Sequence, residues 1–144
     1  MATFGFYADA NLTNAYDAYN PISLTFNVAS AGDKKTVEIW LGSTDTQYKL
    51  VPLPPATTIQ LSVVDLDPAQ HNWNAQNGPW WKIVQDLSQE STTNPLTPLT
   101  VGSQVLGGVN NAFHFYLILY EPQQNPGYYT DWVLTTNDVQ VVPI

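Results

Sequence analysis

The chain contains no cysteine and no arginine, and few of its 144 residues are charged. Without cysteine it has no disulfides, no thiol nucleophile and no thiolate metal ligand, so packing of apolar side chains must hold the fold. Its four lysines face twelve acidic residues, for a formal net charge of −8. Nucleic acids and anionic membranes bind through clusters of basic residues. Both are therefore excluded as expected partners.

Long apolar runs are also missing. No stretch approaches the roughly 18 consecutive apolar residues of a membrane span. The first residues, Met1–Tyr7, have neither the basic segment nor the apolar run of a signal peptide. We expect synthesis in the cytoplasm without export. The length fits one domain spanning residues 1–144, because most domains contain about 100–150 residues.

Apolar residues recur with period two through most of the chain. The run 22–28 is an example, since Ile22, Leu24, Phe26 and Val28 alternate with polar residues. Such alternation is typical of half-buried strands. The pattern predicts strands near 4–7, 22–28, 37–41, 48–53, 59–63, 80–87, 99–106 in part, 113–120, 132–136 and 139–142. The run 113–120 is apolar on both faces, which favours the middle of a sheet.

Eleven prolines and eight glycines break every window long enough for an amphipathic helix. A short helical turn is expected only near 68–74 or 83–89. Eight or nine short strands in a chain of this length predict an all-β fold, an antiparallel β-sandwich of immunoglobulin-like or jelly-roll type. A small closed barrel is the second choice. The irregular segments 65–79 and 89–98 are expected to be surface connections.

The first irregular segment opens with alternating carboxylates, Asp65 and Asp67, as calcium loops do. It has no glycine at the sixth position, and Gln76 stands where an EF-hand has its glutamate. We expect no metal site and no cofactor. Asp65 and Asp67 are expected to accept hydrogen bonds from backbone amides of their own turn.

Three tryptophans stand close together in the sequence at the end of this segment: Trp73, Trp80 and Trp81. Amide and imidazole side chains accompany them: His71, Asn72, Asn74 and Gln76. Aromatic rings beside amides can stack on sugars and bond their hydroxyls, or can anchor a protein interface. Alternatively, one or two of the tryptophans fill the end of the core.

A second aromatic group, Tyr128, Tyr129 and Trp132, follows the turn Asn125–Gly127. Tyrosine gives a large contact area at low entropic cost, so this group is a further candidate contact surface. The structural alternative is a tyrosine packed against the sandwich.

Catalytic signatures are lacking. The two histidines, His71 and His114, have no Gly-x-Ser-x-Gly nucleophile turn to serve. His114 lies in an apolar run and is expected to be a satisfied core residue. The acids Glu121 and Asp131 are expected to be ordinary residues at strand ends, and no spacing marks a glycosidase pair. We expect that the chain is not an enzyme.

Two segments of the chain are similar to segments of a known group of proteins. The first is Val37–Tyr48, two strands around a Leu41-Gly42-Ser43 turn, and the second is Thr136–Val142. Together they resemble small β-sandwich virion proteins of tailed bacteriophages, a group that includes head decoration and tail-associated proteins. The resemblance implies a structural role in the virion, contacts with other virion proteins such as the major capsid protein, and a trimeric or other symmetric homo-oligomer. The alternative is a lectin-like sandwich that binds glycans through Trp73, Trp80 and Trp81.

Overall fold

The computed structural model describes residues 3–28, 31–69, 73–123 and 131–144. These residues form eleven strands and two short 3-10 helices. The strands are β1 (Gly5–Tyr7), β2 (Ala15–Tyr16), β3 (Asp33–Gly42), β4 (Tyr48–Pro52), β5 (Ile59–Asp65), β6 (Trp80–Val84), β7 (Leu99–Gly102), β8 (Val105–Leu106), β9 (Phe113–Glu121), β10 (Trp132–Thr136) and β11 (Val139–Pro143). The 3-10 helices are η1 (Leu87–Thr92) and η2 (Val109–Asn111). None of the helices in this part of the chain is long and apolar enough to cross a membrane.

The all-β prediction is confirmed, and the strands form a sandwich-like fold of antiparallel sheets. The predicted number of eight or nine strands is too low. Two strands, β2 and β8, contain only two residues each. β8 lies within the predicted segment 99–106, which the structure divides into β7 and β8, and a pairing as short as that of β2 leaves no apolar alternation for a sequence pattern to detect.

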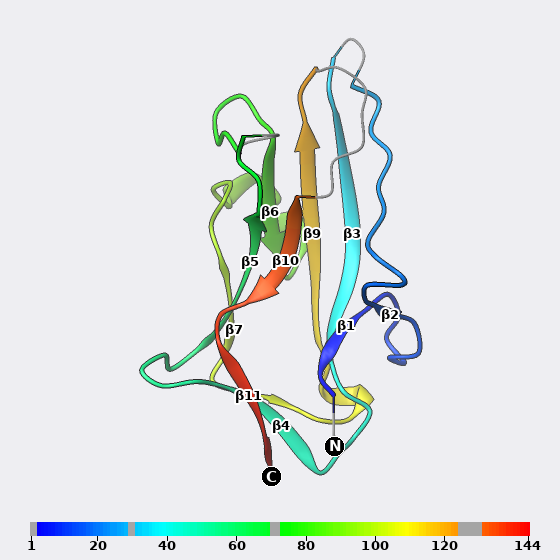
Figure 1. The fold of residues 1–144 in the computed structure, drawn as a ribbon, viewed down its shortest axis with the longest axis vertical. Coiled ribbons are helices and arrows are strands. Elements are labelled where there is room, and N and C mark those ends of the chain that lie inside the picture. Colours follow the sequence, from blue (N-terminus) through cyan, green and yellow to red (C-terminus); the bar gives the residue numbers. More distant parts are fainter. Residues whose placement is uncertain (1–2, 29–30, 70–72, 124–130) are drawn as a thin grey trace.

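One layer is a five-stranded sheet in the order β2-β1-β3-β9-β6 (Figure 1). Strand β9 pairs with β3 on one side and with β6 on the other. The prediction that residues 113–120 lie mid-sheet is therefore confirmed.

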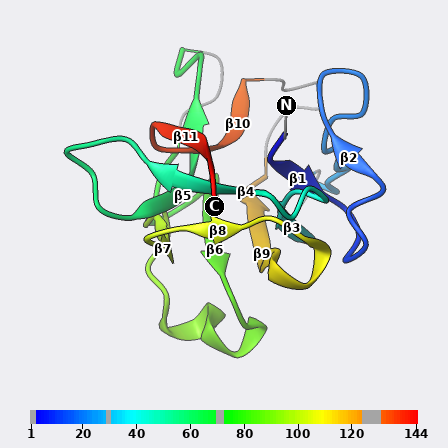
Figure 2. The same cartoon turned by 90° about the horizontal axis from the view of Figure 1, so that it is seen from below.

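The second layer consists of two three-stranded sheets, β10-β5-β7 and β11-β4-β8 (Figure 2). Strands β4 and β5, β7 and β8, and β10 and β11 follow one another along the chain, and each of these pairs has one strand in each sheet. The two sheets are therefore successive halves of one layer. Asn137 lies where β10 passes into β11. Its side chain accepts a hydrogen bond from the Gln60 backbone at 2.8 Å and donates one to the Thr58 carbonyl at 3.0 Å.

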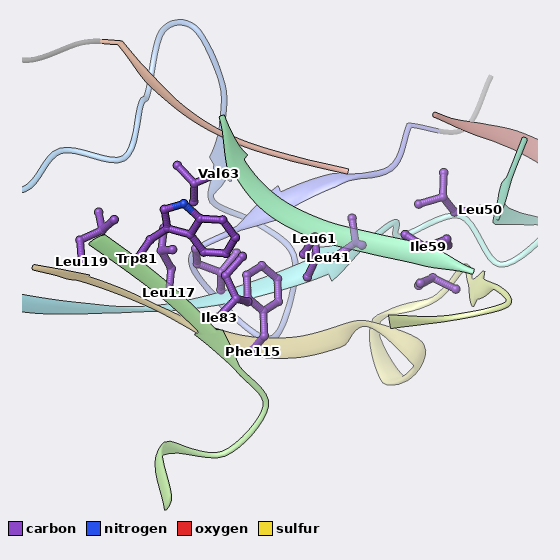
Figure 3. Close-up of a cluster of buried hydrophobic side chains, with 12 residues drawn as sticks. Leu41, Leu50, Ile59, Leu61, Val63, Trp81, Ile83, Phe115, Leu117 and Leu119 are labelled. Atoms are coloured by element: carbon purple, nitrogen blue, oxygen red, sulfur yellow. The ribbon is translucent and has the colours of Figure 1, made fainter. Parts of the chain in front are cut away.

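The core lies between the two layers (Figure 3). Residues of odd number on β3 and β9 point into it, for example Ile39 and Phe115, which are both fully buried. Residues of even number on β9 point to the opposite, outer face of the five-stranded sheet. The buried core residues are Ile39, Leu41, Leu50, Ile59, Leu61, Val63, Trp81, Ile83, Val105, Phe115, Leu117 and Leu119.

The strand predicted at 22–28 is wrong as a strand, although its burial alternates as expected. Ile22, Leu24 and Phe26 pack against the core, and the segment runs alongside β3 in Figure 1. The Asn27 amide donates to the Asp33 carboxylate at 3.0 Å instead of to a β3 carbonyl. Alternating burial requires only one packed face, whereas a strand also requires a backbone ladder.

The predicted strand 80–87 ends at Val84, because η1 begins soon afterwards. Asp86 caps this helix. Its carboxylate accepts from Ser88 N at 2.9 Å, and Gln89 Oε1 accepts from Asp86 N at 3.2 Å. The sequence pattern for a helical turn at 83–89 therefore places the turn too early. The other predicted turn, 68–74, lies partly outside the described residues.

Candidate functional site

Several strands begin or end at one end of the sandwich, which is the top of Figure 1 and is called the upper end below. Strands β5 and β9 finish there at Asp65 and Glu121, and β6 and β10 start there at Trp80 and Trp132. Antiparallel pairing thus brings Trp80 of the first predicted aromatic group and Trp132 of the second, far apart in the sequence, to the same end of the molecule.

The indole rings of Trp73 and Trp132 stack with centroids 4.0 Å apart and planes at 25°. Each ring comes from a different predicted group. Both are partly buried and pack against the core. Trp73 Nε1 is buried and has no hydrogen-bond partner.

The neighbours Trp80 and Trp81 point to opposite faces of the five-stranded sheet, because side chains alternate along a strand. Trp80 lies on the outer face, where it stacks on Tyr120 at 5.3 Å, with Lys82 Nζ 5.1 Å from its ring centroid. Trp81 is 4 % exposed and packs in the core, where Figure 3 draws it near Leu119. The prediction that Trp81 contacts a partner or glycan is therefore corrected, because its ring belongs to the core.

Asn74 builds the turn that leads into β6. Its carbonyl accepts from Gly78 N at 2.8 Å, and its amide donates to the Pro79 carbonyl at 2.8 Å. Its side-chain oxygen accepts from Gln76 N at 2.9 Å. Asn74 and Gln76 are exposed. The turn therefore presents amide groups to solvent near the upper end.

Four predicted contact residues lie outside the described residues. They are His71, Asn72, Tyr128 and Tyr129, and the turn Asn125–Gly127 lies outside as well.

Two carboxyl groups meet beneath the upper end. Asp65 Oδ1 accepts from Asp67 N at 3.0 Å, which confirms that Asp65 bonds a backbone amide of its turn. Asp131 lies against this turn, because its carbonyl accepts from Leu66 N at 2.7 Å. Asp131 is 5 % exposed. Neither oxygen of Asp131, nor Asp65 Oδ2, has a hydrogen-bond partner.

Burial raises the pKa of Asp131 above its ordinary value, and the neighbouring carboxyl group of Asp65 and the negative charge of Asp67 raise it further. The expectation that Asp131 is an ordinary strand-end acid is wrong. Glu121 is also buried, at 3 % exposure. No local pattern distinguishes these acids. The burial of Asp131 follows from the pairing of the next residue, Trp132, with Asp65 on β5.

The far end of the outer face carries a second aromatic row. His114 stacks on Trp40 with centroids 4.5 Å apart, and Tyr116 lies 5.0 Å from the imidazole. His114 Nε2 lies 2.8 Å from Glu38 Oε1. The His114 side chain is 37 % exposed. The prediction of a core histidine is therefore wrong, because residue 114 is an even-numbered position of β9 and these positions point to the outer face.

Among the described residues, no group of three or more His, Cys, Asp or Glu side chains is arranged to hold a metal ion. Two depressions in the surface of the described residues lie away from the upper end. One, of about 390 Å³, is lined by Leu53–Ala56 and Asn137–Asp138. The other, of about 300 Å³, is lined mainly by β8 and the turns beside it.

Comparisons with protein-family models, with curated proteins and with solved structures found no match for this chain.

Proposed function

We propose that the chain is a non-enzymatic structural protein of a virus particle, a capsid decoration or tail-associated protein that binds the particle surface through its upper end. The proposal rests on the stack of Trp73 on Trp132, which joins one residue of each predicted aromatic group at this end. Aromatic clusters with few charges are typical of the centre of protein interfaces. The phage setting comes from the sequence resemblance.

The outer face near the upper end extends this surface. Trp80, Tyr120 and Lys82 form a continuous group of two stacked rings and one ammonium. Cationic and aromatic side chains together contribute strongly to protein recognition. The partner would be another virion protein, such as the major capsid protein, and copies of the chain would assemble symmetrically. Under this proposal the protein is made in the host cytoplasm and acts in the virion.

Light scattering on the purified chain after size-exclusion chromatography tests the proposal, together with cosedimentation with capsid particles. We expect a symmetric oligomer or particle binding, weakened at least tenfold by Trp80→Ala. The matched control is Trp40→Ala, which removes an outer-face tryptophan stacked on His114 at the far end of the same sheet. A strict monomer that fails to bind particles would contradict the proposal, as would equal effects of both substitutions.

Glycan binding is the second candidate. It is favoured by Trp73 standing beside the exposed amides of Asn74 and Gln76, since rings and amides together recognise sugars through stacking and hydrogen bonds. Trp81 has no part in it because of its burial. A broad glycan array tests this function: binding that Trp73→Ala abolishes without loss of fold supports it, and an array with no retained glycan rejects it.

A further inference from the structure

We infer that the carboxyl groups of Asp65 and Asp131 form a calcium-binding site beneath the upper end of the sandwich. The inference does not rest on the proposed function. It starts from three buried oxygens without a partner, namely Asp65 Oδ2 and both carboxyl oxygens of Asp131. Asp131 as a whole is 95 % buried, since only 5 % of its surface is exposed. A buried carboxylate without a compensating partner is costly, so either a proton or a bound cation would stabilise these oxygens.

The two carboxyl groups are held close together by the backbone. Strands β5 and β10 pair so that Asp65 stands opposite Trp132, the residue after Asp131. The hydrogen bond from Leu66 N to the Asp131 carbonyl, at 2.7 Å, continues this pairing beyond the strand ends. Asp67 adds a third negative charge nearby. The site is therefore built by the register of two strands.

The number of unpartnered oxygens separates a cation from a proton. One proton shared by the pair would occupy Asp65 Oδ2 and one oxygen of Asp131. It would leave the second Asp131 oxygen without a partner and one negative charge buried. A divalent cation can neutralise both carboxylates and contact all three oxygens.

The burial of the oxygens favours calcium over magnesium. Calcium accepts carboxylates in bidentate as well as monodentate mode, completes its shell with backbone carbonyls and water, and tolerates irregular geometry. Magnesium demands a near-ideal octahedron and usually keeps several waters. An ion that binds these three buried oxygens must lose much of its water shell. Calcium loses its water more readily than magnesium, so the site favours calcium. Because only two carboxylates supply the buried oxygens, we expect a modest affinity for calcium.

Isothermal titration of the EDTA-treated wild-type chain with CaCl₂ tests the site directly. We expect one calcium per chain, a melting temperature that rises with each tenfold increase in CaCl₂, and a much smaller response to MgCl₂. Asp131→Asn and Asp65→Asn should each abolish the calcium response. The matched control is Asp138→Asn, which removes the same charge from the exposed turn between β10 and β11.

Failure of the wild-type chain to bind calcium up to about 10 mM, above the dissociation constants of weak extracellular calcium modules, would overturn the inference. The titration uses the unaltered protein, so a variant that does not fold leaves this outcome intact. An equal calcium response in wild type and Asp131→Asn would also overturn it, because the ion would then bind elsewhere. Oligomer formation and particle binding are measured separately, so the two proposals can fail independently.

Discussion

Trp73 and Trp132, 59 positions apart in the sequence, place their ring centroids 4.0 Å apart. Trp132 is fixed by its pairing with Asp65 on β5. Trp73 belongs to the long connection that leads into β6. The stack therefore ties a connecting segment to the second layer, next to the buried carboxyl pair. Loss of the stack should loosen the upper end while the strands beneath it stay paired.

A double-mutant cycle on Trp73→Ala and Trp132→Ala should give a favourable coupling free energy of about 0.5–1.5 kcal/mol, the amount typical of an aromatic pair beyond its area burial. Urea unfolding of the four proteins measures the coupling. Trp40→Ala combined with Trp132→Ala is the control, because Trp40 stacks on His114 and the two effects should add. A coupling indistinguishable from zero in the Trp73 cycle would mean that the stack contributes nothing to stability.

The buried carboxyl of Asp131 should make part of the stability fall as pH rises. Its pKa is raised in the folded chain, so between the ordinary value and the folded value the folded state binds more protons than the unfolded state. The contribution is present at low pH and is lost as pH rises through the folded pKa. In EDTA, the stability of the wild type minus that of Asp131→Asn should decrease with rising pH, measured by urea unfolding. A difference that is constant with pH would contradict this.

Three acids at the surface should act in the opposite direction. Hydrogen bonds, chiefly from Thr13, Asn27 and Ser88 respectively, lower the pKa values of Asp9, Asp33 and Asp86. Their contributions are present above the ordinary carboxyl pKa and are lost as pH falls through the lowered values. Asp9→Asn should therefore reduce the loss of stability on acidification, measured by thermal unfolding at a series of pH values. A loss of stability on acidification that is as steep in Asp9→Asn as in wild type would contradict this prediction.

Asn137 should be among the most sensitive polar positions. Asn137→Ala removes the side-chain hydrogen bonds to Gln60 N and the Thr58 carbonyl, and it leaves those partly buried groups unpaired. We expect a loss of about 1–3 kcal/mol in the free energy of unfolding. Asn137→Asp keeps the acceptor for Gln60 N and loses only the donor to Thr58, so its effect should be smaller. Equal stability of Asn137→Ala and wild type in urea would show that water replaces both bonds.

Gly107 should tolerate no side chain. A Cβ at this position would lie 1.8 Å from the Asp45 carbonyl oxygen and 2.7 Å from that of Tyr48, both backbone atoms. Gly107→Ala should destabilise the chain by more than the roughly 1–3 kcal/mol typical of overpacking. At Gly5, by contrast, a Cβ would meet only Tyr7, at 3.8 Å. Thermal unfolding of Gly107→Ala and Gly5→Ala compares the two, and similar melting temperatures would refute the prediction.

The alternation of apolar residues was sufficient to predict the all-β fold and the central position of β9, because a strand buried on both faces must be apolar on both. It was insufficient for Ile22–Val28, where Ile22, Leu24 and Phe26 are partly buried without a ladder. Burial leaves a mark in the local sequence, whereas a ladder depends on the backbone of another segment.

The same distinction applies to the candidate site. The aromatic and polar residues around Trp73 and Trp132 were enough to select both as contact residues. Their stack could not be predicted, because it depends on how two segments far apart in the sequence pack together. Trp80 and Trp81 are equivalent in the sequence until the sheet decides which of them faces the core. His114 was predicted for the core on the strength of its apolar neighbours, yet its parity places it on the outer face beside Glu38.

Most strand-forming segments, the all-β class and the absence of thiol chemistry follow from residue types and their local spacing alone. The tertiary structure decided which strands pair, which tryptophan is buried and which acids meet. Asp65 and Asp131 are the clearest case. Asp65 ends β5 and Asp131 directly precedes β10, and only the antiparallel register of these strands brings the two acids together, with Asp131 buried.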